Sequence, residues 1–178
     1  MNKIRCSMLI LAVVFLLIGC ATTDKDVEYN GENRYTDRKA GFSICPPASW
    51  QTIEVTGFKS KFLFGPPEDN FAPNMNFLEE KIDGGLKQTI DATLPELQKL
   101  FADFKLVSRS DFQTESNAVG EKLIYTITQN GIPIRMHQYF IPGRNGLHMI
   151  ISCGSPGSAD DKYDALYDRT VGTFMWTK

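Results

Sequence analysis

Short runs of apolar residues, or of alternating apolar and polar residues, mark the first half of the chain. Proline, glycine and asparagine separate these runs, and these residue types favour turns. Four of the runs are GFSIC, WQTIEV, KFLFG and NMNFLEE, which begin at Gly41, Trp50, Lys61 and Asn74. Each run has the length of a strand and is too short for an ordinary helix. The pattern therefore predicts several short β-strands in this part of the chain.

The middle of the chain has the spacing of an amphipathic helix. Its apolar residues recur at helical intervals and share one face: Leu86, Ile90, Leu94, Leu97, Phe101 and Phe104. Pro95 interrupts the segment, and Thr93 with Glu96 has the pattern of a capping box. We therefore expect a helix that either restarts at Thr93 or bends at Pro95. The next run, KLVSRSDFQ from Lys105, predicts another strand.

Two turn signals divide the second half of the chain. Asn130 and Gly131 form the pair that is most typical of a two-residue type I′ hairpin, and PGRNG from Pro142 provides a longer turn. Three antiparallel strands are therefore expected between Gly120 and Cys153. A closing helix is expected after them, because its apolar residues form a stripe: Tyr163, Leu166, Tyr167, Val171 and Phe174.

The order of these elements is strands, helix, strands, helix. This order predicts an α+β fold with a central antiparallel β-sheet of about six to seven strands flanked by helices. The regular alternation of strands and helices that a parallel nucleotide-binding sheet requires is not present in the sequence.

The N-terminus has the pattern of a lipoprotein signal peptide. Lys3 and Arg5 give a basic start, and an uncharged run follows from Ser7 to Ile18, which is the length of a signal-peptide core and short for a membrane span. The run ends in Leu17-Ile18-Gly19-Cys20, which matches a lipobox. The sequence therefore predicts cleavage before Cys20 and lipidation of the Cys20 thiol. An ordinary secretory signal with a coincidental cysteine is the alternative.

The sequence predicts three regions: a signal peptide over residues 1–19, a lipidated flexible tether over residues 20–38, and one globular domain over residues 39–178. The tether is expected because this segment is polar and has almost nothing to bury. Ala21 follows the cysteine, and in enteric-type sorting the absence of aspartate there favours the outer membrane. We therefore expect a lipid-anchored protein of the cell envelope, on the periplasmic side of the outer membrane if the organism has one.

Charge and motifs exclude several classes of function. The formal net charge is −2, and loss of the signal peptide removes two basic residues and no acidic ones. No basic stripe is visible, so nucleic-acid binding is not expected. The sequence has no G-x-S-x-G, H-E-x-x-H, G-x-G-x-x-G or Walker motif. We therefore predict no catalytic residues and no cofactor, and we expect that the chain is not an enzyme.

Histidines and paired acids are the remaining candidates for a metal or an acid–base site. If the second hairpin turns near Arg144, His137 lies opposite Ile151 and His148 lies opposite Phe140, so the two histidines are on opposite faces of the sheet. Adjacent acids such as those at positions 79 and 80 also point to opposite faces of a strand. No metal site is therefore predicted.

Four cysteines occur in the chain. Cys6 leaves with the signal peptide and Cys20 carries the lipid, so Cys45 and Cys153 remain outside the reducing cytosol. A disulfide between them is possible, since cysteines often pair in an oxidising compartment. Two buried free thiols that act as small hydrophobic residues are the alternative, and a redox pair is the third interpretation.

Phe71 is the aromatic residue that the pattern explains least well. It lies in the proline-rich segment GPPEDNFAP, which we expect to be an exposed loop. Phe71 is therefore either a contact for a partner protein or a residue that packs beneath its own loop.

The arrangement resembles the PsbP-like superfamily, which includes the photosystem II extrinsic subunit and bacterial envelope proteins of the DcrB and LpqN type. The similar segments are GFSICPPASW, FADFKLVS after the central helix, the meander GEKLIYTITQNGIPIRMHQYFIPGRNGLHMII, and the closing helix that ends in TFMW. The resemblance covers most of residues 40–178. It implies an antiparallel sheet sandwiched by helices, an accessory or binding role, and no catalytic machinery.

Two functions are compatible with these observations. The first is a membrane-anchored envelope lipoprotein that acts as a non-catalytic accessory module and binds an envelope protein that the sequence does not identify. The second is a periplasmic lipoprotein that binds a small ligand or a metal, either between the sheet and a helix or beneath the loop over residues 65–73.

Overall fold

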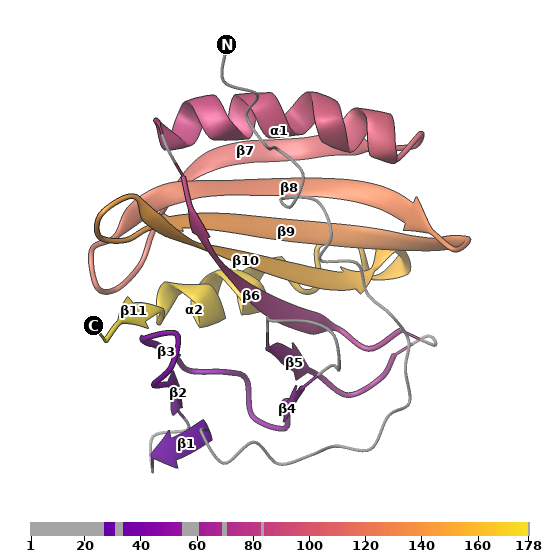
Figure 1. Cartoon of the computed structure of the whole chain (residues 1–178). Coiled ribbons are helices and arrows are strands. Elements are labelled where there is room, and N and C mark those ends of the chain that lie inside the picture. Colours follow the sequence, from indigo (N-terminus) through magenta and orange to yellow (C-terminus); the bar gives the residue numbers. More distant parts are fainter. Residues whose placement is uncertain (1–26, 31–33, 55–60, 69–70, 83, 178) are drawn as a thin grey trace.

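A seven-stranded antiparallel sheet forms the centre of the molecule, with the strand order β4-β5-β6-β10-β9-β8-β7 (Figure 1). The computed structural model describes residues 27–30, 34–54, 61–68, 71–82 and 84–177. The strands of this sheet are β4 (Gln51–Ile53), β5 (Phe62–Phe64), β6 (Asn74–Lys81), β7 (Lys105–Gln113), β8 (Val119–Gln129), β9 (Ile132–Pro142) and β10 (Leu147–Pro156). The α+β fold class and the strand number that the sequence predicts are confirmed.

A second, smaller sheet was not expected from the sequence. It has four antiparallel strands in the order β1-β2-β3-β11. Its strands are β1 (Val27–Asn30), β2 (Arg34–Asp37), β3 (Phe42–Ile44) and β11 (Met175–Trp176). Because β11 is the end of the described chain and pairs with β3, this sheet joins the two ends of the domain.

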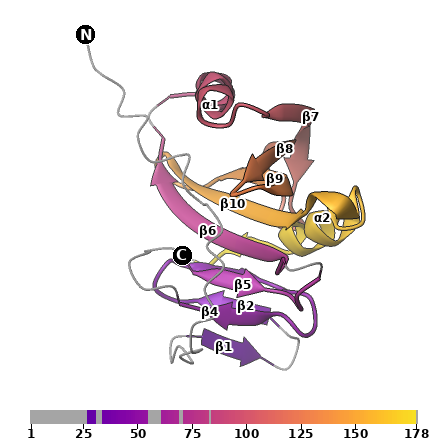
Figure 2. The same cartoon turned by 90° about the vertical axis from the view of Figure 1, so that its right-hand side faces the viewer.

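Two α-helices cover opposite faces of the large sheet (Figure 2). They are α1 (Leu86–Leu100) and α2 (Asp164–Gly172), and a short 3₁₀ helix, η1 (Gly157–Ala159), precedes α2. The side of the sheet that contacts α1 is called the α1 face here, and the other side is called the α2 face. Apolar residues of the small sheet share the core of the α2 face, so that face is covered by α2 and the small sheet together.

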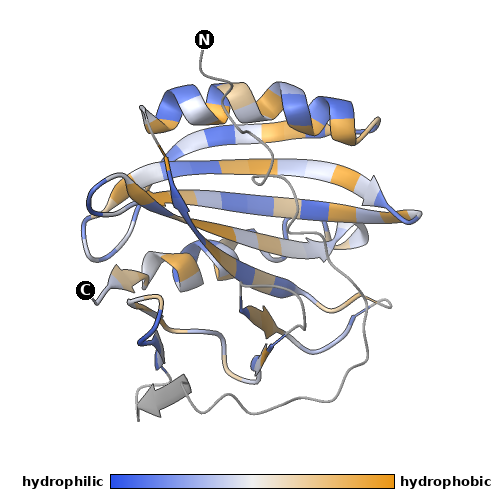
Figure 3. Cartoon of the chain, viewed as in Figure 1, coloured by the Kyte–Doolittle hydropathy of each residue, from blue (hydrophilic) through white to orange (hydrophobic). Residues whose placement is uncertain are grey.

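Alternation along the strands divides the large sheet into these two faces. In β9, Ile134, Met136 and Phe140 belong to the core beneath α1, whereas Tyr139 and Ile141 belong to the core beneath α2. Successive side chains of a strand point to opposite sides, so both faces of β9 and β10 are buried. In Figure 3, apolar residues are spread along the central strands, whereas helix α1 shows both apolar and polar residues around its surface.

The central hairpin forms as its sequence predicts. Asn130 and Gly131 have φ angles of 52° and 78°, as a type I′ turn requires, and β8 pairs with β9 directly on either side of them. The second turn places Asn145 and Gly146 at positive φ between β9 and β10. Three consecutive strands therefore form a meander of neighbouring antiparallel pairs.

Helix α1 is continuous from Leu86 to Leu100 with Pro95 inside it. The side chains of Ile90 and Leu97, on the face of the helix that contacts the sheet, are buried, as the apolar stripe predicts. The predicted capping box at Thr93 is wrong, because Thr93 lies within the helix and its hydroxyl donates a hydrogen bond to the carbonyl oxygen of Thr89 at 2.9 Å. Pro95 is tolerated on the exposed side of the helix, so the helix does not restart there.

The side chain of Trp176 connects the small sheet to the large one, and Trp50 packs against α2 on the same face. The Nε1 atom of Trp176 donates a hydrogen bond to the carbonyl oxygen of Pro142 at 3.1 Å. The indole ring lies so close to Gly143 that a Cβ atom there would be 2.8 Å from it. Trp50 packs edge-on against Tyr167 of α2, with ring centroids 6.2 Å apart. Gly143 is therefore required by this close approach of the two sheets.

The folded domain begins earlier than the sequence predicts. Strands β1 and β2 lie within residues 20–38, for which we expected a flexible tether. Tyr35 is fully buried, with an exposure of 0%, and its ring packs against Phe42 and Phe77. The segment looks polar because Tyr35 is the one apolar side chain of β2 that contributes to the core. The predicted signal peptide, residues 1–19, lies outside the described residues.

We expect Tyr35→Ala to lower the free energy of unfolding by about 3–5 kcal/mol, because it removes a buried aromatic ring and leaves a cavity. Lys39→Ala, two residues beyond β2 and exposed, should change it by less than about 0.5 kcal/mol. Urea unfolding followed by circular dichroism measures both. Equal stability of the Tyr35 variant and the parent would show that β2 does not belong to the folded domain.

Candidate functional site

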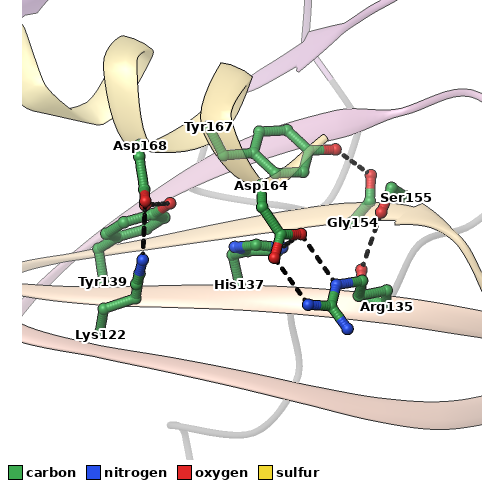
Figure 4. A network of polar contacts seen from close by, with 9 residues as sticks. All are labelled: Lys122, Arg135, His137, Tyr139, Gly154, Ser155, Asp164, Tyr167 and Asp168. Carbon is green, nitrogen blue, oxygen red and sulfur yellow. Dashed lines mark hydrogen bonds and ion pairs between the residues drawn. The ribbon is translucent and has the colours of Figure 1, made fainter. Parts of the chain in front are cut away.

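A network of charged and polar side chains lies between α2 and strands β8 and β9 (Figure 4). Asp164 is in the first turn of α2, and Asp168 is one turn later on the same side of the helix. Arg135 donates two hydrogen bonds to Asp164, from Nε to Oδ1 at 2.9 Å and from Nη2 to Oδ2 at 2.7 Å. This fork-to-carboxylate arrangement is the strongest common form of an ion pair.

Asp168 makes the second half of the network. The Nζ atom of Lys122 lies 2.9 Å and 2.8 Å from its two carboxylate oxygens, and the hydroxyl of Tyr139 donates to Oδ1 at 2.7 Å. Tyr167, on the same helix, donates to the carbonyl oxygen of Gly154 at 2.6 Å. The helix is therefore fixed to three neighbouring strands, β8, β9 and β10, by polar contacts.

Charge balance sets the protonation of Asp164. Its partial burial would raise the pKa, but the hydrogen bond from Arg135 and the nearby positive charge hold the pKa below its ordinary value. The carboxylate is therefore ionised at neutral pH and balances Arg135.

His137 lies between Arg135 and Tyr139 on the α2 face of β9 and is completely buried. Its Nε2 atom is 3.0 Å from Oδ1 of Asp164, but neither ring nitrogen makes a hydrogen bond of acceptable geometry with a described residue. Its ring lies 5.1 Å from the ring of Tyr167. Burial lowers the pKa of His137 to about 4, and the attraction of Asp164 only partly opposes this. His137 is therefore neutral at physiological pH.

Cys153 is directly opposite His137 in the pairing of β10 with β9 and is also completely buried. Burial raises the pKa of the Cys153 thiol well above its ordinary value, so the reactive thiolate is not formed at neutral pH. A neutral imidazole beside a protonated thiol is not an activated nucleophile. The network positions α2 and has no group that is prepared for covalent chemistry.

The predicted separation of the two histidines is confirmed, although the register differs from the prediction. His137 lies opposite Cys153 and His148 lies opposite Pro142, which is two residues away from the expected partners. A shift of two residues keeps every side chain on its face. His148 is on the α1 face, where it lies opposite Glu80 of β6.

Cys45 and Cys153 are both free thiols in the structure, so the disulfide is not formed. Cys153 acts as a small hydrophobic residue of the core, which was the alternative that the sequence left open. Cys45 is half-buried, and its backbone N–H donates to Oγ1 of Thr173 at 2.7 Å. Cys20, the predicted lipidation site, lies outside the described residues.

Phe71 is a core residue and not a surface anchor. Its exposure is 1%, and it belongs to the apolar cluster beneath α1. The ring lies over Gly154, where a Cβ atom would be 3.5 Å from Cζ of Phe71. Of the two interpretations from the sequence, packing beneath its own loop is the one that the structure shows, and the partner contact is not supported.

A row of buried polar side chains crosses the α1 face of the large sheet. Gln138 of β9, Ser152 of β10 and Asn76 of β6 are directly opposite one another in successive strand pairs. All three are at least nine-tenths buried. Gln138 donates to Ser152 at 3.3 Å, but Oε1 of Gln138 and Nδ2 of Asn76 have no hydrogen-bond partner among the described residues. Such groups are costly to bury, so this row requires an explanation.

The described residues contain neither a group of ligands for a metal ion nor a helix able to span a membrane. Within them, no three histidine, cysteine, aspartate or glutamate side chains are grouped so that they could hold a metal ion. None of the described helices combines the length and the apolar character needed to cross a bilayer.

Sequence reasoning missed the α2 network. The signal was present, because Arg135, His137 and Tyr139 alternate on one face of a predicted strand, and Asp164 and Asp168 are four residues apart in a predicted helix. Only the tertiary structure shows that these two sets face each other.

Solved structures with the same fold support the class of the domain. The sequence matches no protein-family model and no curated protein at a significant level. The fold is similar to that of cyanobacterial PsbP (CyanoP) from Synechocystis sp. PCC 6803, with a TM-score of 0.57 and 13% identity over 89% of this chain and 98% of that one. The chain therefore has a PsbP-like α+β fold.

Two further structures are similar to this one. One is LpqN of Mycobacterium tuberculosis, described as involved in cell envelope biogenesis, with a TM-score of 0.58 and 12% identity over 77% of this chain and 83% of that one. The other is the Ran-binding protein Mog1p of Saccharomyces cerevisiae, with a TM-score of 0.58 and 9% identity over 82% of this chain and 95% of that one. At these identities the likeness is one of fold.

The buried state of His137 predicts a specific dependence of stability on pH. Its pKa is about 4 in the folded protein, against an ordinary value of 6.5. Between these values the unfolded chain binds a proton that the folded chain does not, so stability falls as the pH is lowered from 6.5 to 4. We expect a loss of up to about 3 kcal/mol over this range, at about 1.4 kcal/mol per pKa unit.

The variant His137→Phe removes this titration and keeps an aromatic ring beside Tyr167. We expect the difference in unfolding free energy between this variant and the parent to grow in favour of the variant as the pH falls from 6.5 to 4. Urea unfolding at four or five pH values measures this difference. A difference that does not change with pH would show that His137 is protonated in the folded protein or not buried.

Proposed function

We propose that this protein is a lipid-anchored protein of the bacterial cell envelope and that its PsbP-like domain is a non-catalytic accessory module that binds another envelope protein. The lipobox of the sequence supports the anchor, and the way the folded domain uses its charged side chains supports the non-catalytic role.

The observation that carries the non-catalytic role is how the α2 face uses its polar groups. Lys122 and Arg135 are paired with Asp168 and Asp164, and these contacts hold α2 on the sheet. His137 is neutral and buried beside them. Catalytic groups must reach a substrate, whereas these groups are in contact with one another. The arrangement favours a stable scaffold whose outer surface makes the functional contacts.

The proteins of similar fold agree with this proposal. LpqN is described as involved in cell envelope biogenesis, and Mog1p is described as a Ran-binding protein. Neither description names a chemical reaction. We therefore expect a binding or accessory role for this chain, which has the same fold.

The anchor rests on Leu17-Ile18-Gly19-Cys20 after a basic start and an apolar core. A single acyl chain gives only marginal membrane binding, but a bacterial lipoprotein carries two or three chains on one cysteine. The domain would then stay at the membrane surface, close to other envelope proteins. Its high local concentration there would favour binding to a partner protein even through weak contacts.

The test uses intact cells that are fed an alkyne analogue of palmitate. We expect the parent protein to carry the label and to sediment with membranes, because acyl chains on Cys20 hold it there. The variant Cys20→Ala should lose both the label and the membrane association. A labelled Cys20→Ala protein would contradict lipidation at this residue.

The partner is sought with a photoreactive amino acid at exposed positions on different sides of the domain, such as Gln98, Arg144 and Ala165. We expect irradiation of intact cells to link one envelope protein reproducibly from one side of the domain, and much less of it in the Cys20→Ala background. Linking of the same set of abundant proteins from all three positions would argue against a specific accessory role.

A second candidate function is binding of a small polar ligand on the α1 face. The unpartnered atoms of Gln138 and Asn76 support it, because a ligand that offers one hydrogen-bond donor and one acceptor would satisfy both. Ordered water is the competing explanation.

Native mass spectrometry of protein purified from its own cells distinguishes these explanations. A bound ligand is expected to add a defined mass that disappears on denaturation, and Gln138→Leu should lose this adduct while it keeps the fold. Arg144→Ala, on an exposed turn, is the matched control and should keep the adduct. A clean apo mass for the parent protein would rule out a retained ligand.

A further inference from the structure

Strand β7 is one end of the large sheet and pairs with β8 alone among the described strands (Figure 2). It runs from Lys105 to Gln113, and most of its residues are exposed. In an edge strand, every second residue directs its backbone N–H and C=O groups away from the sheet, where they can pair with another strand. The edge therefore has unused hydrogen-bonding capacity over nearly its whole length.

Two charged residues on β7 differ in their ion pairs, because one has two partners of opposite charge and the other has none among the described residues. Arg109 contacts two carboxylates, with its Nε atom 2.6 Å from Oε2 of Glu121 and its Nη1 atom 2.5 Å from Oδ1 of Asp91. Asp111 lies directly opposite Glu121 in the pairing of β7 with β8. Like charges in directly opposite positions destabilise a sheet. Asp111 has no ion pair with any described residue.

The burial of Glu121 makes the repulsion between its carboxylate and that of Asp111 more unfavourable. Its exposure is 4%, and its Oε1 atom has no hydrogen-bond partner among the described residues. Two carboxylates, those of Asp91 and Glu121, therefore share the guanidinium of Arg109, and Asp111 lies beside Glu121 without a positive partner among the described residues. A positive charge opposite Asp111, on the open side of β7, would reduce this excess of negative charge.

We propose that β7 pairs with β7 of a second copy of this chain, antiparallel, with the two-fold axis at Ser110. In this register Arg109 of each copy lies opposite Asp111 of the other copy, so the pairing brings the missing positive charge to Asp111 twice. The contact is isologous and closes into a dimer. Ser110 faces Ser110 of the second copy at the centre.

The charges select this register over its neighbours. In a continuous sheet, directly opposite residues lie on the same face, and residues alternate between the faces along each strand. A two-fold axis perpendicular to the sheet must therefore pair one residue with its own copy, so the axis lies between two copies of the same residue. Moving the axis by one residue places Arg109 opposite Arg109 of the second copy, or Asp111 opposite Asp111 of the second copy. Both alternatives add a like-charge pair, whereas the register at Ser110 adds two opposite-charge pairs.

The irregularity in β7 limits how far the pairing extends. The pairing of β7 with β8 shifts register between Leu106 and Ser108, and Val107 is 46% exposed at this bulge. Regular pairing with a second copy is therefore confined to Ser108–Phe112, and bulges are a common way to keep an edge from pairing without limit. We therefore expect a dimer whose strands pair over these five residues, and we do not expect a larger assembly built through this edge.

Register-specific disulfide formation tests the proposal on the full-length chain, in its own membranes and in detergent. In Ser110→Cys the two introduced thiols would be directly opposite, with Cβ atoms about 4.5–5.5 Å apart, close enough for a small local movement to allow a disulfide, so we expect covalent dimers under mild oxidation. Ser108→Cys, on the same face of the same edge, would lie opposite Phe112 of the second copy and should form them at least about tenfold more slowly. The parent protein, with Cys45 and Cys153, gives the background.

A second variant tests the charge argument without any disulfide. Asp111→Arg would place two Arg–Arg pairs in the contact, so we expect loss of the dimer in sedimentation experiments, with unchanged circular dichroism because Asp111 is exposed. Asp111→Asn should weaken the dimer less. A parent chain that stays monomeric, or equal rates for Ser108→Cys and Ser110→Cys, would overturn the proposal. These measurements need no envelope partner, so they are independent of the proposed function.

Discussion

Strand β9 carries an arginine, a histidine and a tyrosine on one face, and the histidine and the tyrosine are fully buried. The arginine side chain is 13% exposed, and a guanidinium with so little hydration is unfavourable unless a carboxylate meets it with good geometry. Helix α2 brings two carboxylates to the sheet, and the fork of Arg135 on Asp164 fixes where the helix starts. The same helix carries Tyr167, whose ring packs against Trp50 and belongs to the core that the small sheet shares. The α2 face is ordered by electrostatics as much as by apolar packing.

The two faces of the large sheet manage buried polarity differently. On the α2 face nearly every charged group has a close partner of opposite sign, although His137 stays neutral. On the α1 face, unpartnered atoms remain on Asn76, Gln138 and Glu121. Each such atom reduces stability by an amount comparable to a lost hydrogen bond. Apolar residues at these positions would avoid this loss, so the α1 face keeps buried polar groups that reduce the stability of the fold.

The sequence predicts well those features that depend on neighbouring residues. Asn130-Gly131 specifies its hairpin, the apolar stripe specifies α1, and the alternation of β9 and β10 specifies the opposite faces of the two histidines. Features that depend on distant residues are missed. Strand β2 contributes a single core side chain, Tyr35, and the pairing of Asp164 with Arg135 spans two elements that only the tertiary fold brings together. Phe71 is ambiguous in the sequence for the same reason, since it packs over Gly154, a residue of the distant strand β10.

The placement of the two tryptophans has a practical consequence. Trp50 and Trp176 both pack in the core of the α2 face, and neither belongs to the cluster beneath α1. Indole emission therefore reports on only one half of the core. Separation of α1 from its strands would leave the fluorescence of the protein nearly unchanged, whereas detachment of β11 would change it at once. A comparison of fluorescence with circular dichroism can thus resolve which half of this molecule opens first.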